Sequence, residues 1–196
     1  MSMQLNLPTL LTLIRIALIP VFVLVFYLPY SWVNMVTAAI FGLAALTDWL
    51  DGYLARRLGQ TSAFGAFLDP VADKLMVAVA LILLVQQHPS IVFTVPAMII
   101  VGREIAVSAL REWMAELGNR AKVKVSVIGK FKTIAQMVAL LLLLYHEPIG
   151  IIRTQLIGMV LLYVAALLTL WSMVIYLRAA WPVLSGRQKM VSDTKA

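Results

Sequence analysis

The sequence predicts an all-α integral membrane protein, a bundle of six transmembrane helices in one domain. Hydrophobic residues make up 62% of its 196 residues, charged residues make up 13%, and the mean hydropathy is +0.95. Soluble domains contain only about 45 to 50% apolar residues, so a soluble fold is excluded. The apolar residues form six stretches, each close to the roughly 20 residues that a membrane-spanning helix needs. One membrane domain over residues 1–196 is expected, with a basic tail at about 179–196.

Polar or helix-breaking residues mark where the predicted helices begin and end. The first helix has Pro8 in its opening turn, where proline is tolerated. Residues 1–5 carry no basic group and no small-residue cleavage site follows, so we expect this helix to be retained and not removed as a signal peptide. The polar turn 57–62 separates the second and third helices, and a basic stretch at 120–124 separates the fourth and fifth. The six predicted helices cover residues 7–28, 33–56, 64–85, 92–113, 128–145 and 151–177.

Basic residues are distributed unevenly between the connections. They concentrate after the second and fourth helices and in the tail, whereas the other connections carry almost none before Arg153. Cytoplasmic loops carry such an excess, so both termini and the join of the second and third helices are predicted to be cytoplasmic. The net charge of +7 then reflects contacts with membrane lipid headgroups, and no nucleic-acid partner is expected. The residues concerned are Arg56, Arg57, Arg120, Lys122, Lys124, Arg178, Arg187, Lys189 and Lys195.

Four of the nine acidic residues interrupt the second and third apolar stretches: Asp48, Asp51, Asp69 and Asp73. Charge is costly inside a bilayer, so these carboxylates need compensation. Carboxylate oxygens are hard ligands that suit Mg²⁺ or Mn²⁺, whereas the absence of cysteine excludes a thiolate site. The alternative is that the acids pair with basic residues or line a water cavity. Arg56 and Lys74 are too few to match four acids.

Helical spacing predicts that the four acids face one another. Asp48 and Asp51 lie on one face of the second helix, and Asp69 and Asp73 repeat at four-residue spacing on the third. Two helices joined by a short turn can bring these faces together. We therefore expect four carboxylates around one or two divalent cations, with an active site at the cytoplasmic side.

The acids belong to the pattern D-x2-D-G-x2-A-R-x8-G-x3-D-x3-D, which runs from Asp48 to Asp73. All eight fixed positions are similar to the motif of the CDP-alcohol phosphotransferase family. Residues 6–15, 103–104, 109–118 and 129–133 also resemble bacterial members that use glycerol 3-phosphate as the acceptor. The resemblance thus covers nearly the whole chain.

This resemblance implies an integral membrane enzyme that transfers a phosphoryl-linked group from a CDP ester to a hydroxyl. The reaction expected is transfer of the phosphatidyl group of CDP-diacylglycerol to sn-glycerol 3-phosphate, which yields phosphatidylglycerophosphate and CMP. A homodimer in the bacterial inner membrane, working with two Mg²⁺ or Mn²⁺ ions, is also implied.

The resemblance also assigns roles to the residues of the motif. Asp48, Asp51 and Asp69 are expected to bind metal, and Asp73 is expected to bind metal, to act as general base toward the acceptor hydroxyl, or to do both. Helix packing, turn capping and loop charge are alternative roles for several of the other residues. The residues expected to bind CDP-diacylglycerol are Gly52, Ala55, Arg56, Ser62, Gly65, Thr12 and Arg15.

The phosphate of a glycerol 3-phosphate acceptor calls for a basic pocket near the acids. Arg103 and Arg111 lie eight residues apart on the fourth helix, and Lys130 and Lys132 begin the fifth. An arginine within a membrane helix indicates function by default, although pairing of Arg103 with Glu104 is an alternative.

Two other functions compete with this one. Within the family, the acceptor would be phosphatidylglycerol, as in a cardiolipin synthase, or an inositol phosphate. In a different class, four intramembrane acids would form the ion site of a cation transporter. Transporters are typically built from paired halves, and no aspartate cluster after residue 100 matches the first.

Overall fold

The structure, a computed structural model, describes residues 7–58, 63–116 and 127–184, and this part of the chain is helical with short connections. The six predicted helices are confirmed, each within a few residues at most ends. Their bounds are α1 Leu7–Phe26, α2 Val33–Leu58, α3 Ala63–Gln87, α4 Ile91–Glu116, α5 Val127–Tyr145 and α6 Thr154–Leu184.

Local chemistry explains where some of the helices begin and end. The Ser90 hydroxyl accepts a hydrogen bond from the Phe93 backbone N–H at 3.3 Å and so caps α4. α5 ends where His146 takes the left-handed conformation, with φ of 62°. α6 differs most from the prediction: it begins three residues later, after a tight turn at Gly150, and continues to Leu184, into the first residues of the expected tail.

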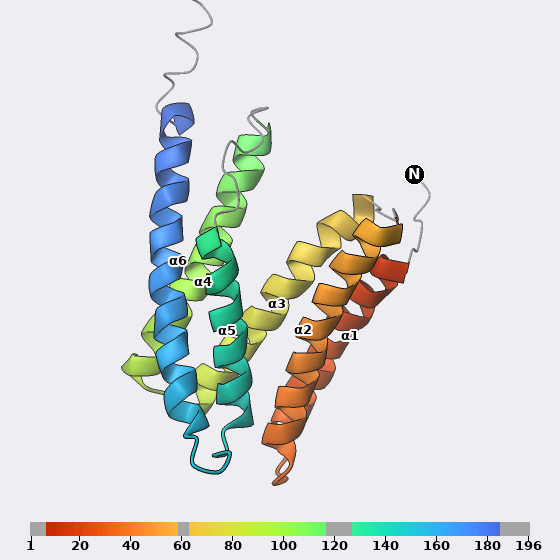
Figure 1. The fold of residues 1–196 in the computed structure, drawn as a ribbon, viewed down its shortest axis with the longest axis vertical. Coiled ribbons are helices and arrows are strands. Elements are labelled where there is room, and N and C mark those ends of the chain that lie inside the picture. Colours follow the sequence, from red (N-terminus) through yellow and green to blue (C-terminus); the bar gives the residue numbers. More distant parts are fainter. Residues whose placement is uncertain (1–6, 59–62, 117–126, 185–196) are drawn as a thin grey trace, which may run out of the picture.

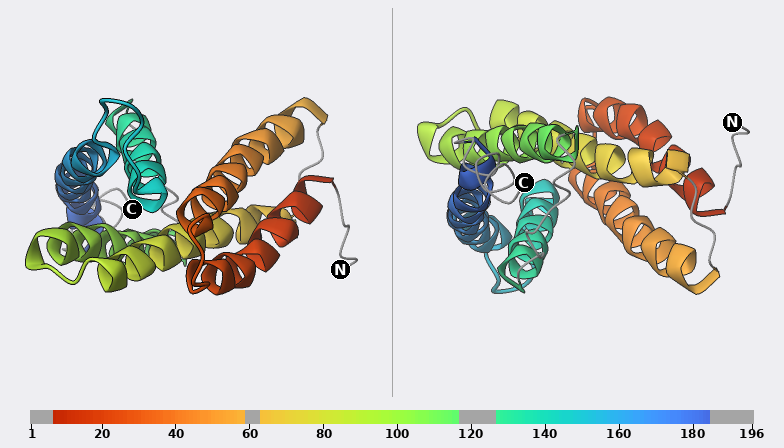
Figure 2. Two further views of the ribbon diagram at one scale, coloured as in Figure 1. Left: turned by 90° about the horizontal axis from the view of Figure 1, so that it is seen from below. Right: turned by 90° about the horizontal axis from the view of Figure 1, so that it is seen from above.

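The helices form two groups that diverge at one end (Figure 1). α1 packs against α2 and α3, whereas α5 and α6 pack closely together beside α4. α3 runs diagonally from the first group to the second, as both end-on views show (Figure 2). α1 begins and α6 ends at the same end of the molecule (Figure 1).

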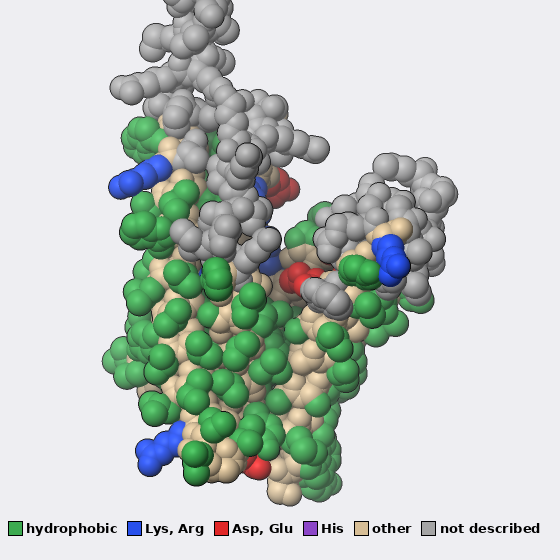
Figure 3. All heavy atoms as spheres, in the orientation of Figure 1, with side chains coloured by type: hydrophobic (Ala, Val, Ile, Leu, Met, Phe, Trp, Pro, Cys, Tyr) green, Lys and Arg blue, Asp and Glu red, His purple; other side chains and the backbone are tan. Residues whose placement is uncertain are grey.

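The outer surface is largely apolar, and charged side chains gather in the hollow between the two groups (Figure 3). Among the described residues, three helices are long and apolar enough to cross a membrane: α1, α4 and α6. α2 and α5 contain shorter apolar stretches, Val33–Asp48 and Phe131–Tyr145. The chain is thus an all-helical protein suited to a membrane.

Candidate active site

Arg15 of α1 lies at the centre of the acidic motif. Its Nη1 atom donates to Oδ1 of Asp48 at 3.0 Å and to Oδ1 of Asp73 at 2.5 Å, and its Nη2 atom donates to Oδ2 of Asp51 at 2.5 Å. One turn earlier, the Thr12 hydroxyl donates to Oδ1 of Asp69 at 2.5 Å. The same face of α1 therefore contacts all four motif aspartates.

The carboxylates differ in their exposure. Arg15 and Asp51 are buried, with side chains 1% and 3% exposed, whereas Asp48 and Asp73 are 36% and 37% exposed. Asp48 and Asp73 line a cavity of about 220 Å³. These two carboxylates are therefore the ones that a ligand in the cavity can reach.

The charge of this cluster fits a divalent cation. Four carboxylates against the single guanidinium of Arg15 leave a formal excess of three negative charges among these side chains. Within the described part of the chain, no three acidic side chains are arranged so that they could hold a metal ion, and the Arg15 guanidinium pairs with three of the motif carboxylates. The motif nevertheless offers only oxygen ligands and carries surplus negative charge. Mg²⁺ and Mn²⁺ prefer ligands of this kind.

The opposite wall of the cavity comes from α4 and α5. Glu104, Lys132, Thr133 and Gln136 face the motif there. The Lys132 ammonium donates to Oε1 of Glu104 at 2.5 Å, and Arg103 donates to the same oxygen at 2.9 Å. The pairing of Arg103 with Glu104, which was the alternative to a phosphate-binding role, is thus present. Lys132 faces Asp48 and Asp73 across the cavity.

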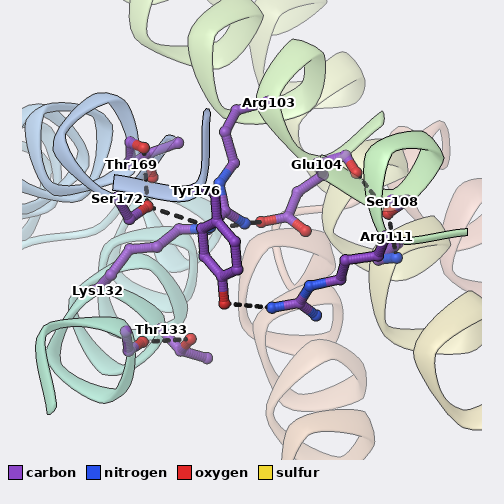
Figure 4. Close-up of polar contacts among 11 residues, drawn as sticks. Arg103, Glu104, Ser108, Arg111, Lys132, Thr133, Thr169, Ser172 and Tyr176 are labelled. Atoms are coloured by element: carbon purple, nitrogen blue, oxygen red, sulfur yellow. Dashed lines mark hydrogen bonds and ion pairs between the residues drawn. The ribbon is translucent and has the colours of Figure 1, made fainter. Parts of the chain in front are cut away.

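A basic cluster of Arg103, Arg111 and Lys132 extends from this wall along α4, where α6 supplies its polar partners (Figure 4). Arg103 also donates to the Ser172 hydroxyl at 3.1 Å, and Arg111 donates to the hydroxyl of Tyr176. The Tyr176 ring lies beside both arginines (Figure 4). The structure therefore brings Arg103, Arg111 and Lys132 into one neighbourhood.

An apolar cavity of about 430 Å³ adjoins the polar one between α3 and α4. Both cavities are lined by Lys74, Val77 and Glu104. Lys74 donates to the Ser108 hydroxyl at this boundary. Charged and apolar binding space therefore lie side by side.

Several predicted residues fall outside what the structure describes. Gly65 is buried in α3, but Ser62 lies outside the described residues, as do the side chains of Ala55, Arg56 and Lys130 and the surroundings of Gly52. Sequence reasoning missed Tyr176, Ser172 and Gln136. Nothing in the local sequence marks them, because their contacts join helices far apart in the chain.

The chain matches known proteins over most of its length. A sequence model described as CDP-alcohol phosphatidyltransferase matches residues 5–171. A Pseudomonas fluorescens protein is 57% identical over 94% of this chain and 96% of its own length. Proteins of Salmonella paratyphi A and Yersinia pestis (strain Pestoides F) are each 58% identical over 91% of this chain, and over 96% and 97% of their own lengths. All three are named CDP-diacylglycerol–glycerol-3-phosphate 3-phosphatidyltransferase. The chain therefore belongs to the CDP-alcohol phosphatidyltransferase family, as its aspartate motif indicated.

Proposed function

We propose that the chain is a CDP-diacylglycerol–glycerol-3-phosphate 3-phosphatidyltransferase, a transferase of phospholipid biosynthesis. The observation that carries the proposal is the shared cavity: Asp48 and Asp73 line one wall and Lys132 lines the other. The names of the relatives support the same pair of substrates. An adjoining apolar cavity suits a substrate with a charged headgroup and acyl chains.

In the proposed reaction the acceptor hydroxyl attacks the phosphorus that bears the diacylglycerol group. A new P–O bond forms, the bond from that phosphorus to the CMP oxygen breaks, and the hydroxyl proton passes to the Asp73 carboxylate. Asp73 suits this role because it is partly exposed to the cavity, while Asp51 is buried beside Arg15. Lys132 on the facing wall orients the phosphate of the acceptor.

A divalent cation completes this proposal, in keeping with a family that uses divalent metal ions. Asp48, Asp51, Asp69 and Asp73 would hold Mg²⁺ or Mn²⁺, two ions for four carboxylates. Bound metal neutralises the charge of the diphosphate and of the departing CMP. The oxygen donors and the surplus negative charge of the cluster support this assignment.

The remaining binding residues follow from the same assignment. Arg103, Arg111 and Lys130 join Lys132 around the acceptor phosphate. The residues proposed to hold CDP-diacylglycerol are Thr12, Arg15, Gly52, Ala55, Arg56, Ser62 and Gly65.

We place the chain in the bacterial inner membrane as a six-span, single-domain protein. Both termini and the cavity lie on the cytoplasmic side in this arrangement, and a homodimer is proposed. Support comes from the basic connections and from the common end at which α1 begins and α6 ends (Figure 1).

The test is acceptor-dependent release of CMP by purified protein. We expect CMP to appear from CDP-diacylglycerol only when glycerol 3-phosphate and Mg²⁺ or Mn²⁺ are both present. Release of CMP with phosphatidylglycerol or an inositol phosphate in place of glycerol 3-phosphate would show that the chain uses a different acceptor from the one proposed. Cation uptake into vesicles without CMP release would favour a transporter.

Asp73→Asn tests the proposed base. The amide keeps the size of the side chain but cannot accept a proton, so we expect turnover to fall by roughly 10²-fold or more. Binding of CDP-diacylglycerol, measured by titration without acceptor, should persist. Glu147→Gln, at an exposed site in the α5–α6 connection, is the matched control and should keep full turnover. Unchanged turnover in Asp73→Asn would remove this residue from the mechanism.

A further inference from the structure

Tyr176 of α6 contacts two arginines of α4 at once. The guanidinium carbon of Arg103 lies 5.6 Å from the centre of the Tyr176 ring, and that of Arg111 lies 4.9 Å from it. Arg111 also donates a hydrogen bond to the Tyr176 hydroxyl (Figure 4). A cation within about 6 Å of an aromatic ring is attracted to the ring electrons. Tyr176 therefore contacts both arginines, in addition to the bonds that Arg103 makes with Glu104 and Ser172.

The basic side chains become more buried toward the polar cavity. Arg111 is exposed, Arg103 is 11% exposed, and Lys132 on the cavity wall is 6% exposed. Eight residues separate Arg103 from Arg111, a rise of about 12 Å along the helix. Arg111 therefore marks the exposed end of the cluster, and Lys132 marks its buried end on the cavity wall.

The charge of this cluster selects one class of anion. Arg103, Arg111 and Lys132 carry three positive charges, and Glu104, which pairs with Arg103 and Lys132, cancels one. The remaining two charges match a phosphate monoester, which approaches two negative charges at neutral pH. A phosphodiester headgroup carries one charge. Guanidinium groups in a fixed orientation also bind phosphate oxygens in pairs.

We propose that Tyr176 is a positioning residue, which holds Arg103 and Arg111 in place to receive the phosphate monoester of the acceptor. The inference rests on the proposed function, because it takes glycerol 3-phosphate as the acceptor. Tyr176 itself touches neither substrate in this arrangement. Its effect is to reduce the side-chain freedom that the two arginines lose when the phosphate binds.

Two variants separate the contributions of the ring and the hydroxyl. Tyr176→Phe keeps the ring beside both arginines and loses the bond from Arg111, so the KM for glycerol 3-phosphate should rise roughly threefold. Tyr176→Leu loses both contacts, and the KM should rise roughly tenfold. The KM for CDP-diacylglycerol should not change in either variant.

Tyr163→Phe is the matched control on the same helix. The Tyr163 hydroxyl donates to the carbonyl oxygen of Val92 at 2.7 Å, at the end of α4 remote from the cavity. This variant should leave both KM values at their wild-type level. A purely structural role for Tyr176 would instead lower the thermal midpoint and affect both substrates equally.

Direct binding distinguishes failure of the inference from failure of the proposed function. The dissociation constant of glycerol 3-phosphate is measured by calorimetry on detergent-solubilised protein without CDP-diacylglycerol. It should rise in the order wild type, Tyr176→Phe, Tyr176→Leu. If the wild type turns over but neither this constant nor the KM changes in Tyr176→Leu, the positioning role is wrong. If the wild type forms no phosphatidylglycerophosphate, the proposed function itself fails.

Discussion

Arg15 is the countercharge of the motif aspartates. A buried carboxylate that loses its partner is strongly destabilising, and here one guanidinium serves three carboxylates. The divalent cation proposed for this site would bind the same carboxylate oxygens. If that proposal holds, Arg15 and the metal stabilise the same cluster and compete for the same oxygens.

Arg15→Gln should make folding depend on metal. In chelator the variant leaves Asp51 buried without its cationic partner, and we expect a loss of about 3 to 5 kcal/mol in the free energy of unfolding. Addition of Mg²⁺ should raise the thermal midpoint of the variant more than that of the wild type. Arg57→Gln, at an exposed site on the same side of the hollow, should respond like the wild type. An equal metal response in both variants would show that Arg15 is not the countercharge.

The aspartates of the site could be predicted from the sequence, but their partner could not. Four acidic side chains in an apolar stretch are energetically costly, so their presence alone indicates that they form one functional site. Arg15 stands 33 residues from Asp48 and 58 from Asp73, and only the packing of α1 on α2 and α3 joins them. The family resemblance implies instead that Arg15 binds CDP-diacylglycerol. That role stays a prediction.

The six helices could be predicted from the sequence, but the way in which they pack against one another could not. A run of about 20 apolar residues defines a spanning helix whatever it packs against. The same apolar character on all faces hides which face meets a neighbour. The close pairing of α5 with α6 and the diagonal course of α3 therefore came only from the structure.

Gly158 sets the close approach of α6 to α5. A Cβ atom added there would lie 2.8 Å from Cγ of Leu143 and 3.2 Å from the carbonyl oxygen of Ala139. Gly158→Ala should therefore destabilise the protein by about 1 to 3 kcal/mol, which is the usual cost of overpacking. The measurement is the thermal midpoint in detergent.

Gly102→Ala is the control for this change. Nothing lies within 4 Å of a Cβ atom added at Gly102, so this variant gains only helix propensity, about 0.5 to 1 kcal/mol. A thermal midpoint that falls for Gly158→Ala and holds or rises for Gly102→Ala supports the packing argument. Equal effects in the two variants would contradict it.

For the whole molecule, a hollow that contains charged side chains lies between the two helix groups, and the surface below it is mostly apolar apart from a few charged side chains (Figure 3). In the proposed reaction, a water-soluble acceptor and CMP must reach this hollow from water, while the acyl chains of CDP-diacylglycerol remain in lipid. The basic connections predict that the hollow faces the cytoplasm. The reaction proposed here thus requires one orientation of the bundle.

Single cysteines test that orientation, because the chain has no native cysteine. Ser31 and Ile151 are exposed in the α1–α2 and α5–α6 connections, and Glu116 is exposed where α4 ends. In intact cells, a membrane-impermeant maleimide should label Ser31→Cys and Ile151→Cys but not Glu116→Cys. Disruption of the membrane should make Glu116→Cys reactive. The reverse pattern would place the hollow outside the cytoplasm, away from any supply of CDP-linked lipid headgroups, and would therefore contradict the proposed reaction together with the orientation.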